Sequence, residues 1–274
     1  RCVSDIGLAM KVLSGPDDRD PSSMPNDGMD FCKAALGTQN LEGRRIAYAG
    51  NIGGVIPLDK EVEKLVKSGA YAFENLGCEV KDACFDASDI QDIITGTRGF
   101  GMVARYAERY DKYQHLMTPQ LINQVSAALD LSVRDVVRSE RLRTAYWHKI
   151  RKFMTNFDYI IAPVVGAPPF RLDEPLPTQV GGVPVDRFQD VFLSTYVFSV
   201  TGLPMISVPC GLTEDGRPVG MQIISRRHRE DQAIEAASAY ERLLPDLFVR
   251  PEMDLMALKP VSDALNTPGV TIKK

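Results

Sequence analysis

Cysteine and histidine are scarce in this sequence, and neither residue forms a metal-binding pattern. The three histidines stand apart from the five cysteines, which are Cys2, Cys32, Cys78, Cys84 and Cys210. The number of cysteines is odd and no C-x-x-C pair occurs, so the sequence predicts neither a disulfide framework nor a zinc site. We therefore expect no metal, no cofactor and reduced thiols in a cytoplasmic protein.

Long apolar runs and an excess of positive charge are also absent. No run of about 18 apolar residues occurs, so the sequence predicts no membrane-spanning helix. Lys and Arg number 32 against 36 Asp and Glu, a net charge of −4, and this balance disfavours a nucleic-acid-binding surface. What is present is a chain of 274 residues, 44% of them hydrophobic, which is long enough to bury a large core.

Hydrophobic periodicity predicts a strand, a helix and a second strand in the first third of the chain. Residues 44–49 have the pattern of a strand, and residues 78–80 begin the next one. Between them, Asp59 is expected to cap a helix that Gly77 ends. A strand, helix and strand in succession form a β-α-β unit, so we expect parallel strands joined by a right-handed crossover.

Further elements follow from the same patterns. A helix is expected to begin at the capping pair Ser4-Asp5 and to stop at Gly15. The remaining expectations are helices through 86–157 with a break near Thr118-Pro119 and one long or two joined helices over 132–157, a buried strand at 158–162, a loop at 168–184, a short helix or irregular segment at 188–200, a final helix at 230–244 and a polar tail at 251–274.

The most informative part of the sequence lies near its C-terminal end. Residues 205–208 and 219–224 are short apolar runs rich in β-branched residues. The step Asp215-Gly216 between them is a strong turn signal. The pattern predicts two strands joined by a polar turn, and the first strand is expected to close at Pro209.

This part of the sequence resembles the C-terminal signature of the amidase signature family of serine hydrolases. That signature has the form N-x-T-G-x-P-A-x-S-V-P-x-G, then a variable turn, then G-x-P-x-G-x-Q. The residues at matching spacing are Thr201, Gly202, Pro204, Ser207, Val208, Pro209, Gly211, Gly216, Pro218, Gly220 and Gln222. The resemblance implies an α/β fold with a mixed β-sheet flanked by helices.

A second resemblance to the same family lies at the start of the chain. A family element of the form R-[ST]-V-x-D-x-A-x-x-x-x-V-L-x-G-x-D-x-x-D is found in mid-domain. The matching residues are Arg1, Val3, Asp5, Val12, Leu13, Gly15, Asp17 and Asp20. We therefore expect residues 1–250 to be the C-terminal part of an amidase signature domain, with the N-terminal catalytic part absent from this fragment.

The resemblance implies amide hydrolysis by a Ser–cis-Ser–Lys triad, in which one serine attacks the carbonyl and the lysine takes the proton through the bridging serine. Backbone N–H groups of a glycine- and serine-rich loop would hold the oxyanion. No G-G-S-S-G-G-S tract and no lysine in the family's lysine context occur here. We therefore assign no catalytic residue and expect the chain alone to be inactive. The expected partners are a small-molecule amide and the N-terminal part of the same enzyme or a companion chain, and family analogy adds homodimerisation.

The same resemblance suggests substrate-binding candidates. Phe192 stands where the A-type polypeptide of glutamyl-tRNA amidotransferase has an acidic residue, and Ser199 stands where many members have asparagine. An aromatic side chain disfavours a charged aminoacyl substrate, so we expect an amidase for small apolar or aromatic carboxamides. The candidate substrate-binding residues are Val164, Val165, Gly166, Phe192, Thr195, Tyr196 and Ser199, and for each of them packing explains the residue equally well.

Other interpretations of single motifs are open at this point. Residues 50–54 are glycine-rich and follow a strand, but they lack the spacings of nucleotide-binding loops, so a plain loop is favoured. Cys210 is expected to fill the core rather than act as a nucleophile. Asp158 is expected to set the strand that leads to the pocket. The alternative function is that of a non-catalytic scaffold or binding subunit that pairs with a hydrolase.

Overall fold

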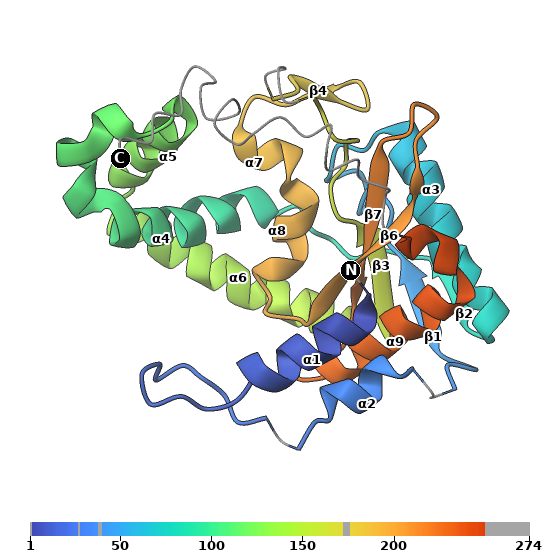
Figure 1. Ribbon diagram of the computed structural model, residues 1–274. Helices are drawn as coiled ribbons and strands as arrows, with labels where there is room; N and C mark the ends of the chain where they lie inside the picture. Colours follow the sequence, from blue (N-terminus) through green and yellow to red (C-terminus); the bar gives the residue numbers. More distant parts are fainter. Residues whose placement is uncertain (1, 27, 38–39, 172–175, 250–274) are drawn as a thin grey trace, which may run out of the picture.

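A five-stranded mixed sheet forms the centre of the protein (Figure 1). The computed structural model describes residues 2–26, 28–37, 40–171 and 176–249. The strand order is β2-β1-β3-β7-β6; β1 is parallel to β2 and β3, and β7 is antiparallel to β3 and β6. The strands are β1 (Arg45–Tyr48), β2 (Glu79–Asp82), β3 (Tyr159–Pro163), β6 (Met205–Leu212) and β7 (Pro218–Ile224).

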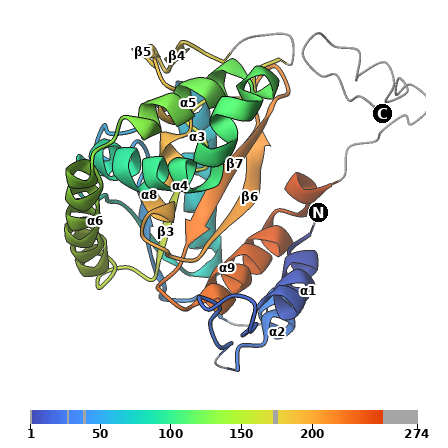
Figure 2. The ribbon, with the colours of Figure 1, turned by 90° about the vertical axis from the view of Figure 1, so that its left-hand side faces the viewer.

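Helices cover both faces of this sheet, which lies between two helical groups in Figure 2. One face carries α1 (Val3–Leu13), α2 (Phe31–Ala35), α3 (Lys60–Tyr71) and α9 (Glu230–Leu243). The other carries α4 (Ile90–Tyr113), α6 (Val133–Phe153) and α8 (Leu193–Ser199). The remaining elements are α5 (Pro119–Leu129), α7 (Phe188–Val191), the hairpin of β4 (Gln179–Val180) and β5 (Val183–Pro184), and the short 3₁₀ helices η1 (Ala72–Leu76), η2 (Gln114–Leu116) and η3 (Pro245–Phe248). The predicted fold class, a mixed sheet flanked by helices, is confirmed.

The inner strands divide the core into two clusters. In β3, Tyr159 and Ile161 belong to the cluster under α3 and α9, whereas Ile160 and Ala162 belong to the cluster under α4, α6 and α8. These four side chains are buried, because a central strand with helices on both faces has no solvent-facing side. Burial on both sides fixes the register of β3 and thereby the position of the loop that follows it.

Local signals position most helix ends as the sequence predicts. The Asp59 carboxylate caps α3, and Gly77 ends η1 in the left-handed region at φ 77°. Ser132 caps α6, which is one continuous helix. The prediction for α1 is wrong by two residues: Cys2 is the N-cap, and the carboxylate of Asp5 lies one turn into the helix, where it accepts a hydrogen bond from the Cys2 N–H.

Strand β6 is longer than its sequence pattern indicates. The prediction that the strand closes at Pro209 is wrong, because β6 continues to Leu212 through a bulge between Pro209 and Gly211. Within the described sheet β6 is an outer strand, and a proline is tolerated where one side of a strand has no ladder partner. Gly211 has φ 150°, a backbone conformation that other residues rarely adopt. Met205 and Ser207 are exposed, so the second face of β6 lies open in the described part of the chain.

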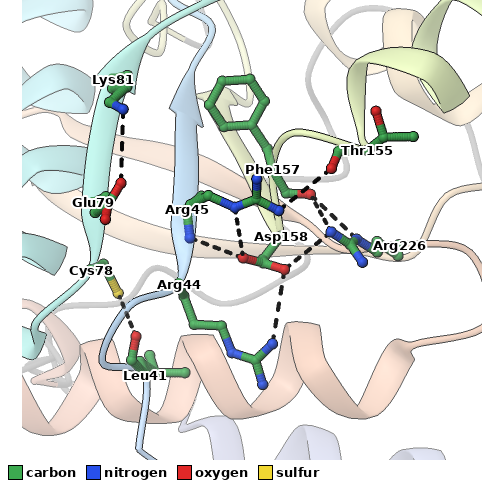
Figure 3. A network of polar contacts seen from close by, with 10 residues as sticks. All are labelled: Leu41, Arg44, Arg45, Cys78, Glu79, Lys81, Thr155, Phe157, Asp158 and Arg226. Atoms are coloured by element: carbon green, nitrogen blue, oxygen red, sulfur yellow. Dashed lines mark hydrogen bonds and ion pairs between the residues drawn. The ribbon is translucent and has the colours of Figure 1, made fainter.

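Asp158 joins the starts of β1 and β3 (Figure 3). Its carboxylate accepts a hydrogen bond from the Arg45 N–H at 3.0 Å and lies 3.1 Å from the Arg226 guanidinium. Arg226 also donates to the Phe157 carbonyl. These contacts lie at the N-terminal end of β3, so Asp158 anchors the strand that leads to the loop after Pro163, in agreement with the sequence-based expectation.

Two sequence-based expectations fall partly or wholly outside the described residues. The loop expected at 168–184 contains the β4–β5 hairpin, and residues 172–175 within it are outside the described ranges. The tail expected at 251–274 is entirely outside them. Within the described ranges, no helix has both the length and the apolar character needed to cross a bilayer.

Candidate functional site

The carboxyl end of β3 opens into an apolar groove of about 290 Å³, which we call the β3 groove. This end of a strand in an α/β sheet is where ligands usually bind. Among the described residues that line the groove, Ser207 alone carries a polar side chain. The lining consists of Val164, Val165, Ala167, Pro168, Pro169, Phe170, Val191, Phe192, Ser207, Pro218, Val219 and Gly220.

Buried hydrogen bonds fix the wall of the β3 groove. The Val164 N–H donates to the Gly220 carbonyl at 3.2 Å, and the Ser194 hydroxyl donates to the Val164 carbonyl at 2.5 Å. The Gln222 side-chain amide donates to the carbonyls of Pro163 at 2.9 Å and Ser194 at 3.1 Å. Gln222, one of the signature matches, therefore ties the end of β3 to the start of α8. The sequence singles out its position but not this role.

Phe192 lies at the junction of α7 and α8. Its backbone, at φ −106° and ψ 19°, is not helical, and this break separates the two short helices. The half-buried ring packs against a small cluster of Val180, Val185 and Val191 and also lines the β3 groove. The break therefore directs Phe192 toward Val164 and Val165, so three of the seven candidate residues lie in one groove.

Gly166 and Thr195, two other candidates, do not line this groove. A Cβ atom on Gly166 would lie 2.1 Å from the Pro57 carbonyl oxygen, so a glycine is needed there for close backbone approach. The Gly166 carbonyl also accepts a hydrogen bond from the Asp59 N–H at 2.8 Å. The Thr195 hydroxyl donates to the Phe192 carbonyl at 2.7 Å. Both residues shape the backbone next to the groove.

Tyr196 and Ser199 line a different hollow, of about 390 Å³, between α4, α6 and α8. We call it the α8 hollow. It also receives the guanidinium groups of Arg98, Arg105 and Arg143. The seven candidates thus divide between the β3 groove, its backbone support and the α8 hollow. Sequence reasoning missed the three arginines because they lie on helices far from the signature.

A third cavity, of about 400 Å³, lies between α4, α5 and the segment before α7. At its edge, Arg187 donates to the Gln91 side-chain oxygen at 2.6 Å, and the Gln91 amide donates to the Asp190 carboxylate at 2.9 Å. Burial alone would raise the pKa of Asp190, but the hydrogen bonds from Arg187 and Gln91 hold it below its ordinary value of 3.8. These partners are more than 90 residues apart, so no local pattern predicts them.

The described residues bring no hydrolytic nucleophile and base together. The ammonium groups of Lys67, Lys81 and Lys149 pair with carboxylates, and no described lysine is hydrogen-bonded to a serine hydroxyl. Burial raises the pKa of the Cys210 thiol to about 12, so it stays protonated near neutral pH. Among residues 2–249, the undescribed positions aside, no three His, Cys, Asp or Glu side chains form a group that could hold a metal.

Residues 50–54 form a turn whose backbone is held by its own contacts. The Asn51 side chain accepts a hydrogen bond from the Gly54 N–H at 3.1 Å. The next helix, α3, begins only at Lys60, and its first turn carries Glu61 and Glu63 beside the capping Asp59. These carboxylates disfavour a phosphate group at that helix end. The geometry therefore favours a plain loop.

The fold and the grooves define an α/β protein with a ligand-sized apolar site at the carboxyl end of its central strand. The sequence model of the Amidase family matches residues 1–234. This match covers most of the chain, and the chain therefore belongs to the amidase signature family.

Individual relatives agree with this assignment. An acylamidase from Rhodococcus erythropolis is 28% identical over 247 residues, which cover 89% of this chain and 51% of the acylamidase. The A-type polypeptide of glutamyl-tRNA(Gln) amidotransferase from Desulforapulum autotrophicum is 27% identical over 278 residues, covering 90% of this chain and 55% of that polypeptide. The crystal structure of a bacterial aryl acylamidase of the amidase signature family is similar with a TM-score of 0.77 and 30% identity, over 92% of this chain and 55% of that one. The chain spans about half the length of the curated relatives it matches.

Proposed function

We propose that this chain forms part of the acyl pocket of an amidase that hydrolyses small apolar or aromatic carboxamides. The Ser–cis-Ser–Lys triad would be supplied by the N-terminal part of the same enzyme or by a companion chain. Membership of the amidase signature family and the likeness to an acylamidase and an aryl acylamidase support amide hydrolysis as the reaction class.

The observation that carries the substrate class is the lining of the β3 groove. Its walls are aliphatic and aromatic, and Phe192 stands on one of them. A charged acyl group would lose its hydration in such a groove without gaining an ion pair, whereas an aryl or alkyl group would lose only apolar contact with water. Val164, Val165 and Phe192 are the residues that we assign to substrate contact.

The test is a comparison of substrates with the assembled enzyme. The 274-residue chain is co-purified with the part that carries the triad, and kcat/KM is measured for benzamide and for glutamine. We expect benzamide to be preferred and Phe192→Asp to lower its kcat/KM at least about tenfold. The matched control is Phe100→Asp on α4, whose side chain is 64% exposed and lies outside the groove. A preference of the unmodified enzyme for glutamine contradicts the proposed substrate class.

The same proposal predicts that the 274-residue chain by itself releases no ammonia from benzamide. Turnover by the purified chain, which mass spectrometry shows to be free of any companion, contradicts the assignment of the triad to another segment. An assembly that binds benzamide but never hydrolyses it would instead support the alternative, a non-catalytic binding subunit.

A further inference from the structure

The α8 hollow has an unusual balance of charge. Arg98 and Arg105 reach it from α4, Arg143 reaches it from α6, and its lining includes no carboxylate among the described residues. The nearest acidic contact of these arginines is Glu140, which lies 3.3 Å from the Arg143 guanidinium, one turn away on the same exposed helix face. Arg98 and Arg105 have no carboxylate partner in the described part of the chain.

Arg98 is held in place by neutral groups. Its Nη2 donates to the Gln124 side-chain oxygen at 2.6 Å, and its guanidinium carbon lies 5.6 Å from the centre of the Tyr196 ring. Its Nε is buried and has no hydrogen-bond partner. A guanidinium offers five donors in a fixed fork that suits a carboxylate. Arg98 is therefore oriented in advance, with donor capacity that the described residues do not use.

Arg143 is also oriented. Its Nε donates to the Val200 carbonyl at 2.8 Å, at the end of α8. The hydroxyl-bearing side chains of Thr97, Tyr196 and Ser199 add polar groups to the same hollow. The Ser199 hydroxyl donates only to the Tyr196 carbonyl at 3.5 Å, the limit of a hydrogen bond. Positive charge and hydroxyl groups thus surround one space of about 390 Å³.

Apolar side chains complete the lining and narrow the class of ligand. Ile94, Met102 and Val200 lie among the arginines. A bare inorganic anion would leave these apolar groups without contact, whereas an organic acid has a carboxylate for the guanidinium groups and a hydrocarbon body for the apolar wall. We propose that the α8 hollow is a binding site for a small organic carboxylate, separate from the β3 groove. The acid released by amide hydrolysis is of this class, but the inference depends only on the lining.

The test uses the purified 274-residue chain and needs no catalysis. Binding of benzoate, benzyl alcohol and inorganic phosphate is measured by isothermal titration calorimetry, with the contact site mapped by NMR chemical shifts. We expect saturable binding of benzoate at α4, α6 and α8, and binding at least about tenfold weaker for benzyl alcohol and for phosphate. Equal affinity for benzyl alcohol, or shifts confined to the β3 groove, would overturn the proposal.

Variants assign the effect to the hollow. Arg98→Met and Arg105→Gln should each weaken benzoate binding about tenfold or more, and Arg98→Lys should restore only part of the loss because it keeps the charge but not the fork. The controls are Arg141→Gln, on α6 but outside the hollow, and Phe192→Ala in the β3 groove; neither should change benzoate affinity. Arg105 is exposed, so its variant tests the site even if Arg98→Met unfolds the chain. Unchanged affinity in a folded Arg105→Gln chain, together with no benzoate-specific shifts at α8, would refute the assignment.

Discussion

Replacing Gln222 with methionine tests how the wall of the β3 groove is held. Methionine has nearly the same length and can fill the same buried space, so the change removes two hydrogen bonds and little packing. The Gln222 side chain is 3% exposed, and it donates to the Pro163 and Ser194 carbonyls at 2.9 and 3.1 Å. Both carbonyls lose a buried donor that water cannot readily replace.

The magnitude follows from these two contacts. A buried polar group left unpaired costs about 1–3 kcal/mol, so we expect Gln222→Met to lower the free energy of unfolding by about 2–4 kcal/mol. For a chain of this size that loss lowers Tm by roughly 5–15 °C. Gln222→Glu should be worse at neutral pH, because a carboxylate would face two carbonyl oxygens with no proton to donate.

The measurement is urea unfolding followed by circular dichroism. Gln120→Met is the control, because Gln120 is exposed on α5 and its side chain has no bond to the sheet; it should change the free energy of unfolding by less than about 0.5 kcal/mol. If Gln222→Met is as stable as the unmodified chain, the bridge between β3 and α8 does not hold the wall, and our account of the groove is wrong.

Three further predictions follow from burial and charge. Because burial raises the pKa of Cys210 to about 12, its thiol should resist alkylation at pH 8 until the chain unfolds, whereas the exposed Cys84 should react at once, and peptide mass spectrometry separates the two. Burial would raise the pKa of Asp190, but hydrogen bonds from Arg187 keep it below its ordinary value; the carboxylate therefore stabilises the fold above about pH 4 and stops doing so as the pH falls through the lowered pKa. Asp190→Asn should accordingly destabilise the chain at pH 7 and much less at pH 3, and equal losses in urea unfolding at both pH values would contradict this. Gly166→Ala should lower the free energy of unfolding by more than about 2 kcal/mol, because its Cβ would lie 2.1 Å from a backbone oxygen, and a thermal melt unchanged from that of the parent would show that the backbone can move apart.

The sequence alone determined the features whose causes are local. Asp59, Gly77 and Ser132 fix helix ends through their own side chains or backbone angles, so each was predictable without tertiary structure. The spacing of glycines and prolines from Thr201 to Gln222 likewise placed the chain in its family. The continuation of β6 past Pro209 was not predictable, because it depends on β6 being an outer strand.

Tertiary structure decided how the candidate residues are grouped. Phe192, Tyr196 and Ser199 have spacings that suit one side of a helix, and sequence reasoning placed them in one pocket wall. The backbone break at Phe192 turns its ring to the β3 groove, while Tyr196 and Ser199, inside α8, face Arg98 across the α8 hollow. The arginines come from α4 and α6, and the Gln222 contacts span 28 and 59 residues. Contacts over such separations form only when the sheet and both helical layers pack together, so no local pattern in the sequence encodes them.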